Sequence, residues 1–473
     1  MELERTISLK EAVVYGVGTI IGAGIYALIG VTAGITGNAL WMSFLVAAII
    51  AFTTAFSYVE LSSRFPRSSA ESLYVYKAFH NKLLSFMSGY VFILIFLFSI
   101  SAVAWGFASY FKLFLDLPAV LFAFGITVLC ATVSYLGVQK SAKLEAALTI
   151  GAVLGLLLVI FFGARFVGSV DLFTGVNGES GFALFWPIIS GASLIFFAFL
   201  GFEGLGGLSA EIKEPNRNVP KAIIFSLGFA TILYMLVSVV AVSVITPAEL
   251  ASAANPNLAL TQGPLALVAE KAIAPGAGVL LSIIALFATS STILGMFVMA
   301  SVFVYGMSKD GWLPKMFSEA SKRHTPRNAI LLILSVSLLF VLMGDLEIMG
   351  ALTTMGTFLV FALANISLIK IRLDESNSNS HLVEQHGLFV KSLYHRGVVP
   401  MHRKNQQKIV FSPLNFKNIP LLAVFGATFC LAMFLTQFWI PIMVLGVKVP
   451  LMIVGLGFFA TGLIVYTYFD KKK

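Results

Sequence analysis

The sequence predicts an all-α integral membrane protein with twelve transmembrane helices. Three observations lead to this prediction: the composition, a series of long apolar segments, and an uneven distribution of basic residues between those segments. The chain has 473 residues, of which 58% are hydrophobic and 11% are charged, and its mean hydropathy is +0.94. Because soluble domains carry about 25% charged residues, this composition excludes an ordinary soluble protein.

The apolar segments define the order of the expected helices. Twelve of them are long enough, or nearly so, to cross about 30 Å of hydrocarbon as a helix. The ninth and tenth are separated only by a short stretch around Asp345. In chain order, the predicted segments are residues 13–35, 40–60, 84–111, 118–137, 146–167, 184–207, 221–245, 277–306, 329–344, 346–369, 419–438 and 447–468.

The basic residues predict the orientation of these segments. With this segment order, 27 of the 31 Lys and Arg residues fall on one side of the bilayer. The four on the other side are Lys112, Arg165, Lys271 and Lys448. Cytoplasmic loops are enriched in Lys and Arg, so we expect a multi-pass protein of the cell membrane with both termini in the cytoplasm. The net charge of +9 is then a topology signal, and no nucleic acid partner is expected.

Glycines interrupt two of the segments. Four glycines lie between Gly16 and Gly24 in the first segment, and the sixth segment is broken over residues 201–207. Each glycine costs about 1 kcal/mol relative to alanine in a helix interior. Breaks at corresponding positions of two halves indicate the binding site of a secondary transporter. Since these breaks are five segments apart, we expect a 5+5 inverted repeat followed by two additional C-terminal helices.

The first break has the chemistry of an anion site. Unwinding at Gly22, Ala23 and Gly24 would expose the N–H groups that begin a half-helix near Ile25. The positive end of that helix dipole favours a carboxylate, and the small side chains allow close approach to the backbone. The competing explanation is that these glycines let helices pack closely, but their density and the second break favour binding.

The sixth segment offers complementary groups. Carbonyls freed at its break are suitable partners for an ammonium group, and a phenylalanine before the break can lie over the ligand as a gate. Glu203 is a carboxylate within an apolar segment, which by default indicates a functional site. The alternative role for Glu203 is a brace that holds the unwound backbone.

Three motifs resemble those of amino acid permeases in the amino acid–polyamine–organocation (APC) superfamily. The first is Gly22-Ala23-Gly24-Ile25-Tyr26. The second is Gly-Phe-Glu at 201–203, followed by Glu-x-Lys-x-Pro-x-Arg-x-x-Pro-x-Ala-Ile at 211–223. The third covers 305–314 and 325–330. The resemblance in helix order extends over residues 7–372, whereas the last two segments match only in hydropathy.

This resemblance implies the leucine-transporter fold, with alternating access around helices one and six, which are both broken at mid-membrane. It implies that the substrate carboxylate meets the N–H groups of Ala23 and Gly24, and that the ammonium group meets nearby carbonyls. Phe197 occupies the position of the aromatic gate. The expected substrate-binding residues are therefore Ile20, Gly22, Ala23, Gly24, Phe197, Ala198 and Leu200.

The coupling ion is left open between two candidates. Proton-coupled members of this superfamily can carry a lysine in helix five, where this sequence has Ala152. Glu203 could bind and release a proton, or the hydroxyls of Ser291 and Thr292 could bind sodium. The competing explanation for these hydroxyls is a hydrogen bond to their own helix. Because no carboxylate lies near them to balance sodium, we favour proton coupling or plain exchange, with sodium symport as the alternative.

The expected organisation is a transport core at residues 1–369, a cytoplasmic loop at 370–418, and helices eleven and twelve with a basic tail at 419–473. Four histidines between His381 and His402 fit no metal-ligand spacing, so neither a metal nor a cofactor is expected. All six histidines lie outside the apolar segments, which argues against an enzyme. The leading hypothesis is an amino acid transporter, and a membrane receptor that binds amino acids without carrying them is the alternative. The sequence indicates no oligomeric state.

Overall fold

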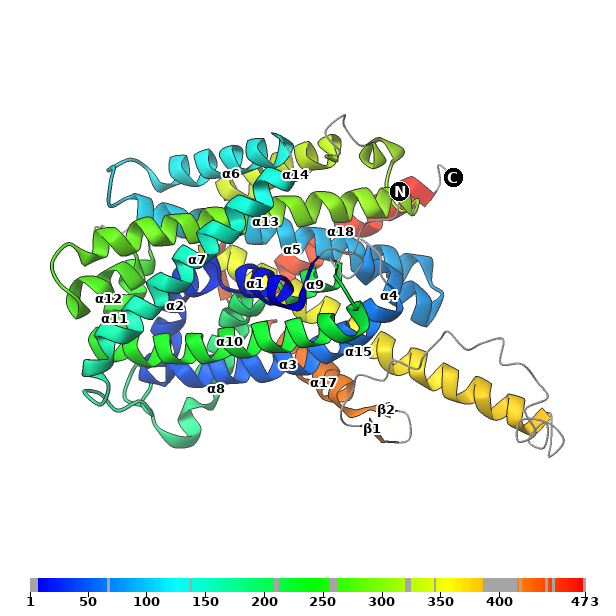
Figure 1. Ribbon diagram of the computed structural model, residues 1–473, viewed down its shortest axis with the longest axis horizontal. Helices are drawn as coiled ribbons and strands as arrows, with labels where there is room; N and C mark the ends of the chain where they lie inside the picture. The colour runs from blue at the N-terminus through cyan, green and yellow to red at the C-terminus, as the bar shows by residue number, and fades with distance from the viewer. Residues whose placement is uncertain are drawn as a thin grey trace.

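A computed structural model describes residues 7–65, 69–136, 138–207, 212–255, 262–319, 325–343, 346–385, 415–416, 419–438, 441–444 and 447–470. Over these residues the fold is a helical bundle whose long helices run mainly along the longest axis of the molecule (Figure 1). The helices appear in the order of the apolar segments. Each segment is helical because a helix satisfies its backbone hydrogen bonds internally.

The first predicted segment forms two helices, α1 (Leu9–Ile20) and α2 (Ala23–Thr36). The sixth forms α8 (Phe185–Ile195), the 3₁₀ helix η4 (Phe196–Phe199) and α9 (Phe202–Gly207). The remaining segments correspond to α3 (Leu40–Arg64), α5 (Lys82–Phe111), α6 (Ala119–Leu136), α7 (Val138–Gly163), α10 (Pro215–Val244), α13 (Ala277–Lys309), α14 (Arg327–Met343), α15 (Leu346–Gln385), α17 (Leu421–Gln437) and α18 (Leu451–Asp470).

Shorter elements connect the long helices. They are α4 (Ala70–Phe79), α11 (Pro247–Ala254), α12 (Pro264–Ala272), and the 3₁₀ turns η1 (Gly37–Ala39), η2 (Ala164–Phe166), η3 (Gly181–Leu184) and η6 (Lys315–Ser318). Ile7, just before α1, forms a parallel bridge with Ile212, and the Lys213 N–H donates to the Ile7 carbonyl at 2.9 Å. The chain before the first broken helix is therefore tied to the chain that follows the second.

Nine stretches of the described chain are long and apolar enough to cross a membrane, which identifies a multi-pass membrane protein. One of them, Leu9–Arg64, combines the first two predicted segments. Helices α14 and α17 are apolar but have only 17 residues each, so at 1.5 Å per residue they fall short of the hydrocarbon thickness. The number of crossings and the inverted repeat stay predictions.

The structure differs from the expectation near the C-terminus. Two short antiparallel hairpins flank α17: β1 (Asn415–Phe416) with β2 (Ile419–Pro420), and β3 (Pro441–Val444) with β4 (Val447–Pro450). The last helix therefore begins only after Pro450, because a proline is tolerated at a helix start and not in a helix interior. Strands are thus a minor addition to an otherwise helical fold.

Helix α15 continues to Gln385, well beyond the expected end at residue 369. Its yellow C-terminal part projects from the bundle in Figure 1, so the first part of the expected loop is helical. Apart from Asn415 and Phe416, the rest of that loop, including His386, His395 and His402, lies outside the described residues. Within the residues that are described, no group of three or more His, Cys, Asp or Glu side chains is placed to hold a metal ion.

Helix α5 forms the centre of the core. All of its most apolar 18-residue window is buried, and it packs against α4, α6, α13, α14 and α15. Peripheral helices instead expose large apolar side chains, such as Phe161 on α7 and Leu342 on α14. In a chain of this composition such side chains face lipid, since lipid chains are as apolar as the side chains themselves.

Candidate functional site

The first predicted break lies between α1 and α2. Ile21 and Gly22 leave the helical conformation, and Gly22 adopts φ −142° and ψ −137°. A Cβ atom added to Gly22 would overlap Thr292 Oγ1 of α13. The close approach of Thr292 therefore leaves no room for a Cβ at this position unless the Thr292 side chain shifts.

The second break follows η4. Leu200 is extended, and Gly201 has φ +118°, a conformation that favours glycine because it has no Cβ. A Cβ on Gly201 would lie 2.6 Å from the Thr19 carbonyl carbon. A Cβ on Gly24 would lie 2.8 Å from that of Ala198, and closer still to the Ala198 Cα. The two broken helices therefore touch each other through glycines.

Two hydroxyl groups brace the breaks. The single O–H hydrogen of Tyr234 on α10 is shared between the carbonyls of Ile20, at 2.8 Å, and Ala198, at 3.1 Å, so one side chain links both breaks. Thr292 Oγ1 accepts a hydrogen bond from the Ala23 N–H at 2.9 Å and donates to the Ala288 carbonyl at 3.0 Å. These contacts satisfy backbone groups that the breaks release from helical hydrogen bonding.

A cavity lies where the two breaks meet. Residues of α1, α2, α5, η4, α9 and α13 line it. Its polar lining includes Ser99, Thr292 and Glu203, together with backbone at the breaks. The apolar side chains in the lining are Ile20, Phe92, Ile95, Phe96, Phe197, Leu200, Met296 and Met299.

Most of the residues that the sequence analysis selected line this cavity. They are Ile20, Gly22, Ala23, Gly24, Phe197, Leu200, Glu203 and Thr292. Ala198 does not line it, because this residue packs against Gly24 and its carbonyl is held by Tyr234. Ser291 does not line it either: it is buried and its hydroxyl donates to the Ala288 carbonyl at 2.9 Å. One residue along a helix turns the side chain by about 100°, which separates Ser291 from Thr292.

The backbone groups at the breaks are unequally available to a ligand. The Ile20 carbonyl already accepts hydrogen bonds from the Tyr234 hydroxyl and the Gly22 N–H, and a carbonyl oxygen has two lone pairs. The Phe197 carbonyl accepts one hydrogen bond, from the Leu200 N–H at 3.2 Å. The first N–H groups of α2 have no acceptor within that helix, and among them the Ala23 N–H donates to Thr292.

Glu203 lies at the cavity and also braces the second break. It lines the cavity, and its Oε2 accepts a hydrogen bond from the Gly201 N–H at 2.9 Å. Its side chain is half-buried in the first turn of α9. The carboxylate thus holds the unwound backbone while it remains next to the space that a ligand would occupy.

Neither Tyr234 nor the α5 side chains were singled out from the sequence. The position of this tyrosine within the seventh apolar segment could have indicated a structural role, because a buried phenol usually finds a hydrogen-bond partner. Phe92, Ile95 and Phe96 carry no such signal, since any apolar residue is expected on a buried membrane helix. Their place in the cavity wall follows only from how α5 packs.

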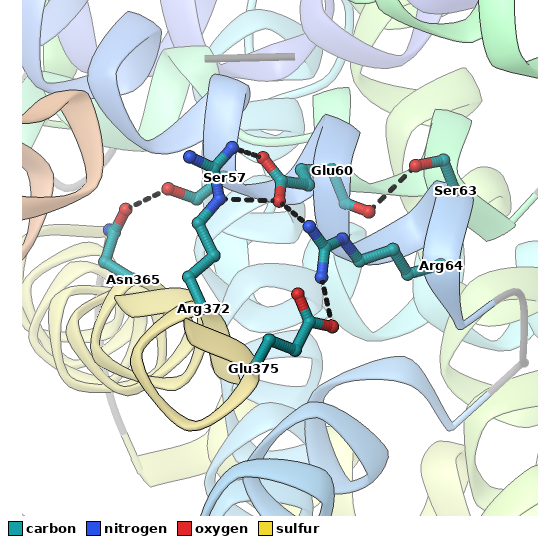
Figure 2. Close-up of polar contacts among 7 residues, drawn as sticks. All are labelled: Ser57, Glu60, Ser63, Arg64, Asn365, Arg372 and Glu375. Carbon is teal, nitrogen blue, oxygen red and sulfur yellow. Dashed lines mark hydrogen bonds and ion pairs between the residues drawn. The ribbon is translucent and has the colours of Figure 1, made fainter. Parts of the chain in front are cut away.

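A charged cluster lies apart from the cavity and joins α3 to α15 (Figure 2). Arg372 Nε donates to Glu60 Oε1 at 2.8 Å, and its Nη2 pairs with Glu60 Oε2. Arg64 Nη2 also lies 2.6 Å from Glu60 Oε1, and its Nη1 lies 3.0 Å from Glu375 Oε1. Glu60 is fully buried and Arg372 is 5% exposed. None of these residues lines the cavity, so the cluster fastens two helices together.

Comparison with known proteins adds independent information. A family model for amino acid permeases matches residues 7–461. The Branched-chain amino acid permease BcaP of Bacillus subtilis is 29% identical over 397 residues, which cover 78% of this chain and 81% of that protein. The Methylthioribose transporter of the same organism is 29% identical over 398 residues, with 78% and 82% coverage. The mitochondrial Cationic amino acid transporter 3 of Arabidopsis thaliana is 27% identical over 397 residues, with 78% and 63% coverage.

The family match extends over nearly the whole chain, including the two broken helices and the cavity between them. It confirms the resemblance carried by the glycine, Gly-Phe-Glu and 305–314 motifs. The similar proteins are named as permeases and transporters, so the expectation that the chain is not an enzyme is also confirmed. The chain belongs to the amino acid permease family of the APC superfamily.

Proposed function

We propose that this protein carries amino acids with apolar side chains across the cell membrane by alternating access around its two broken helices. The observation that supports this most directly is the cavity, which combines a helix start, released backbone carbonyls and mainly apolar walls. Family membership supports an amino acid as the substrate class. A similar protein is named for branched-chain amino acids, which agrees with walls of this chemistry.

In this proposal the start of α2 binds the substrate carboxylate. The N–H groups of Ala23 and Gly24 are the donors, and the Ala23 N–H exchanges its bond to Thr292 for one to the ligand. The helix dipole adds to the attraction, as it does for anions at other helix starts. The carbonyls of Phe197 and Leu200 accept from the ammonium group, together with Ile20 once a donor there is displaced.

The substrate side chain then lies between α5, η4 and α13. Phe92, Ile95, Met296 and Met299 contribute phenyl, aliphatic and thioether surface to this side of the cavity, and Phe197 closes over the ligand as the gate. Among the described residues that line the cavity, Glu203 is the one ionisable side chain, and it is engaged by Gly201. A cationic or anionic substrate side chain would therefore lose hydration without an equivalent partner.

The finer parts of the proposal follow the sequence analysis. Ten of twelve helices form a core at 1–369 built as a 5+5 inverted repeat, and the last two helices follow at 419–473. Both termini and the 370–418 segment lie in the cytoplasm. Coupling is to protons, or transport is amino acid exchange, with Glu203 as the coupling residue. Sodium symport through Thr292 and Ser291 is less favoured, because both hydroxyls donate to the Ala288 carbonyl of their own helix.

The test is flux through purified protein in liposomes. We expect saturable uptake of radiolabelled leucine, isoleucine or valine, competition by other apolar amino acids, and no competition by arginine, aspartate or methylthioribose. Empty liposomes are the control for leak. Binding of leucine without flux would support the receptor alternative, and preferred uptake of arginine would contradict the proposed substrate class.

A further inference from the structure

A second cavity lies between α5, α15, α17 and α18, outside the candidate site. Its volume is about 310 Å³. Its lining consists of Leu, Ile, Val, Met and Phe side chains and two glycines, so no described residue of the lining carries a polar side chain. A buried water molecule needs several polar partners, and this lining offers none. The cavity is therefore suited to an apolar molecule.

The position of this cavity gives lipid access to it. Along α5 it extends from Val91 to Phe98, near the middle of the 30-residue helix Lys82–Phe111. The middle of a membrane-spanning helix lies within the hydrocarbon of the bilayer. Leu456 and Phe459 of α18 also line the cavity, and they are 56% and 38% exposed. The cavity thus reaches from the central helix to the surface of the bundle that faces lipid.

Size and chemistry favour an acyl chain as the occupant. An apolar cavity of about 150 Å³ in a protein interior stays dry and binds small apolar molecules, and the second cavity has about twice that volume. Without an occupant its lining would lose dispersion contacts. In a bilayer the acyl chain is the most concentrated apolar group, so mass action favours it over other apolar ligands.

One side chain belongs to both cavities. Ile95 of α5 lines the second cavity together with Val91, and it lines the candidate site together with Phe92. Successive side chains on a helix are turned by about 100°, so Ile95 lies between two neighbouring faces of α5. Its exposed fraction is only 4%. A group that fills the second cavity therefore packs against a side chain in the wall of the first.

We propose that the second cavity binds one acyl chain of a membrane phospholipid, and that this chain supports Ile95 from behind where Ile95 packs against the substrate. The lipid site itself is independent of the proposed function, and only its effect on substrate binding rests on that function. Because the two ligands share the Ile95 contact, each raises the affinity of the protein for the other.

The first experiment locates the chain by photochemical labelling. The probe is a phosphatidylcholine with a diazirine in the middle of one acyl chain, added to proteoliposomes of dioleoylphosphatidylcholine. After irradiation, mass spectrometry should find adducts on α5 between Val91 and Phe98, although these residues are buried. Adducts on Phe161 of α7, which is strongly exposed, report contact with bulk lipid in the same sample.

Two variants fill the cavity with an indole ring. Leu456→Trp acts from the exposed α18 side, and Leu352→Trp acts from the buried α15 side. Because the ring takes the space of the chain, we expect adducts on α5 to fall at least about tenfold relative to those on Phe161. Thermal unfolding shows which variant keeps the native fold, and one folded variant is sufficient.

The matched control is Leu463→Trp. Leu463 lies on α18 two turns after Leu456 and is also exposed, but it does not line the cavity. This variant should label α5 as wild type does. Absence of α5 adducts in wild type would overturn the lipid site, as would equal α5 labelling in wild type and a folded Leu456→Trp or Leu352→Trp variant.

The second experiment measures the effect on the substrate. Leucine binding is followed by calorimetry in detergent, on protein stripped of lipid and again after dioleoylphosphatidylcholine is added. We expect the added lipid to raise leucine affinity about fivefold in wild type and in Leu463→Trp, and to have no effect in Leu456→Trp. An equal response in all three proteins would overturn the support of Ile95 by lipid. Labelling of α5 in a wild-type protein that binds no leucine would contradict the proposed function and leave the lipid site standing.

Discussion

At the scale of single residues, the candidate site depends on glycines, which have no side chain. Gly24 and Gly201 let the two broken helices meet backbone to backbone, at distances that no Cβ atom tolerates. Tyr234 and Thr292 then occupy hydrogen-bonding groups that this arrangement leaves free. The geometry of the cavity is therefore set by small residues and held by two hydroxyls, and it is sensitive to changes of a single methyl group.

The first residue-scale prediction concerns Gly24. In Gly24→Ala the new methyl group must push against the Ala198 main chain, which cannot rotate away as a flexible side chain could. We expect the two breaks to separate and substrate affinity to fall at least about tenfold, a loss of about 1.4 kcal/mol. Leucine binding by calorimetry measures this change.

The control for Gly24 is a glycine with open surroundings. Outside its own helix backbone, Gly125 on α6 has no heavy atom within 4 Å of the point where a Cβ would lie. Gly125→Ala should therefore leave binding unchanged and stabilise the helix slightly. Normal leucine affinity in Gly24→Ala would show that the first break does not contact the substrate.

At the scale of elements, α3 and α15 are held together by charge as well as by apolar contact. Glu60 receives hydrogen bonds from Arg372 and Arg64 (Figure 2), and nearby Ser57 Oγ donates to Asn365 Oδ1 at 2.6 Å. A buried pair is not automatically stabilising, because desolvation of both ions offsets their attraction. Removing one member of such a pair lowers the stability of the fold, because the other charge stays buried without a partner.

This argument predicts the effect of Glu60→Leu. The substitution removes the buried carboxylate that faces Arg372, and we expect it to destabilise the protein by about 3 kcal/mol. The double variant Glu60→Leu with Arg372→Leu should recover most of that loss. Thermal unfolding in detergent micelles measures both. Lys370→Leu is the control, because its partner Asp374 is exposed and such pairs contribute about 0–1 kcal/mol. Equal stability of Glu60→Leu and wild type would contradict the role assigned to the cluster.

At the scale of the whole molecule, exposed apolar side chains and basic residues each occupy particular regions. The most buried helix, α5, lies in the middle of the bundle, and peripheral helices such as α18 expose most of their apolar residues. With the predicted order of segments, the basic residues lie almost entirely on one side of the bilayer. This distribution predicts one orientation in the bilayer, with α4 and the projecting end of α15 in the cytoplasm.

The orientation is tested with single cysteines. The native Cys130 and Cys430 are buried, so an impermeant thiol reagent should leave them unmodified in intact cells. Ser378→Cys on α15 should also stay unlabelled until the membrane is permeabilised. Ser180→Cys, in the loop between α7 and α8, should react at once and serves as the positive control. Labelling of Ser378→Cys in intact cells would reverse the proposed topology.

The sequence by itself was enough to predict the helical membrane class, the segment order and the places where two helices break. Each of these properties is local: an apolar run satisfies its own backbone hydrogen bonds as a helix, and clustered glycines weaken that helix wherever it packs. For the same reason the sequence selects Gly22, Gly24 and Glu203 as candidate site residues, and all three line the cavity.

Only the tertiary structure decided which distant residues complete the site. Tyr234 lies 214 positions after Ile20, yet its hydroxyl meets the carbonyls of both Ile20 and Ala198, and no local pattern encodes such a pairing. Ser291 and Thr292 are adjacent and chemically alike, yet only Thr292 lines the cavity. Helix phase and packing set that difference, because side chains that meet across helices are chosen by the fold and not by their neighbours in sequence.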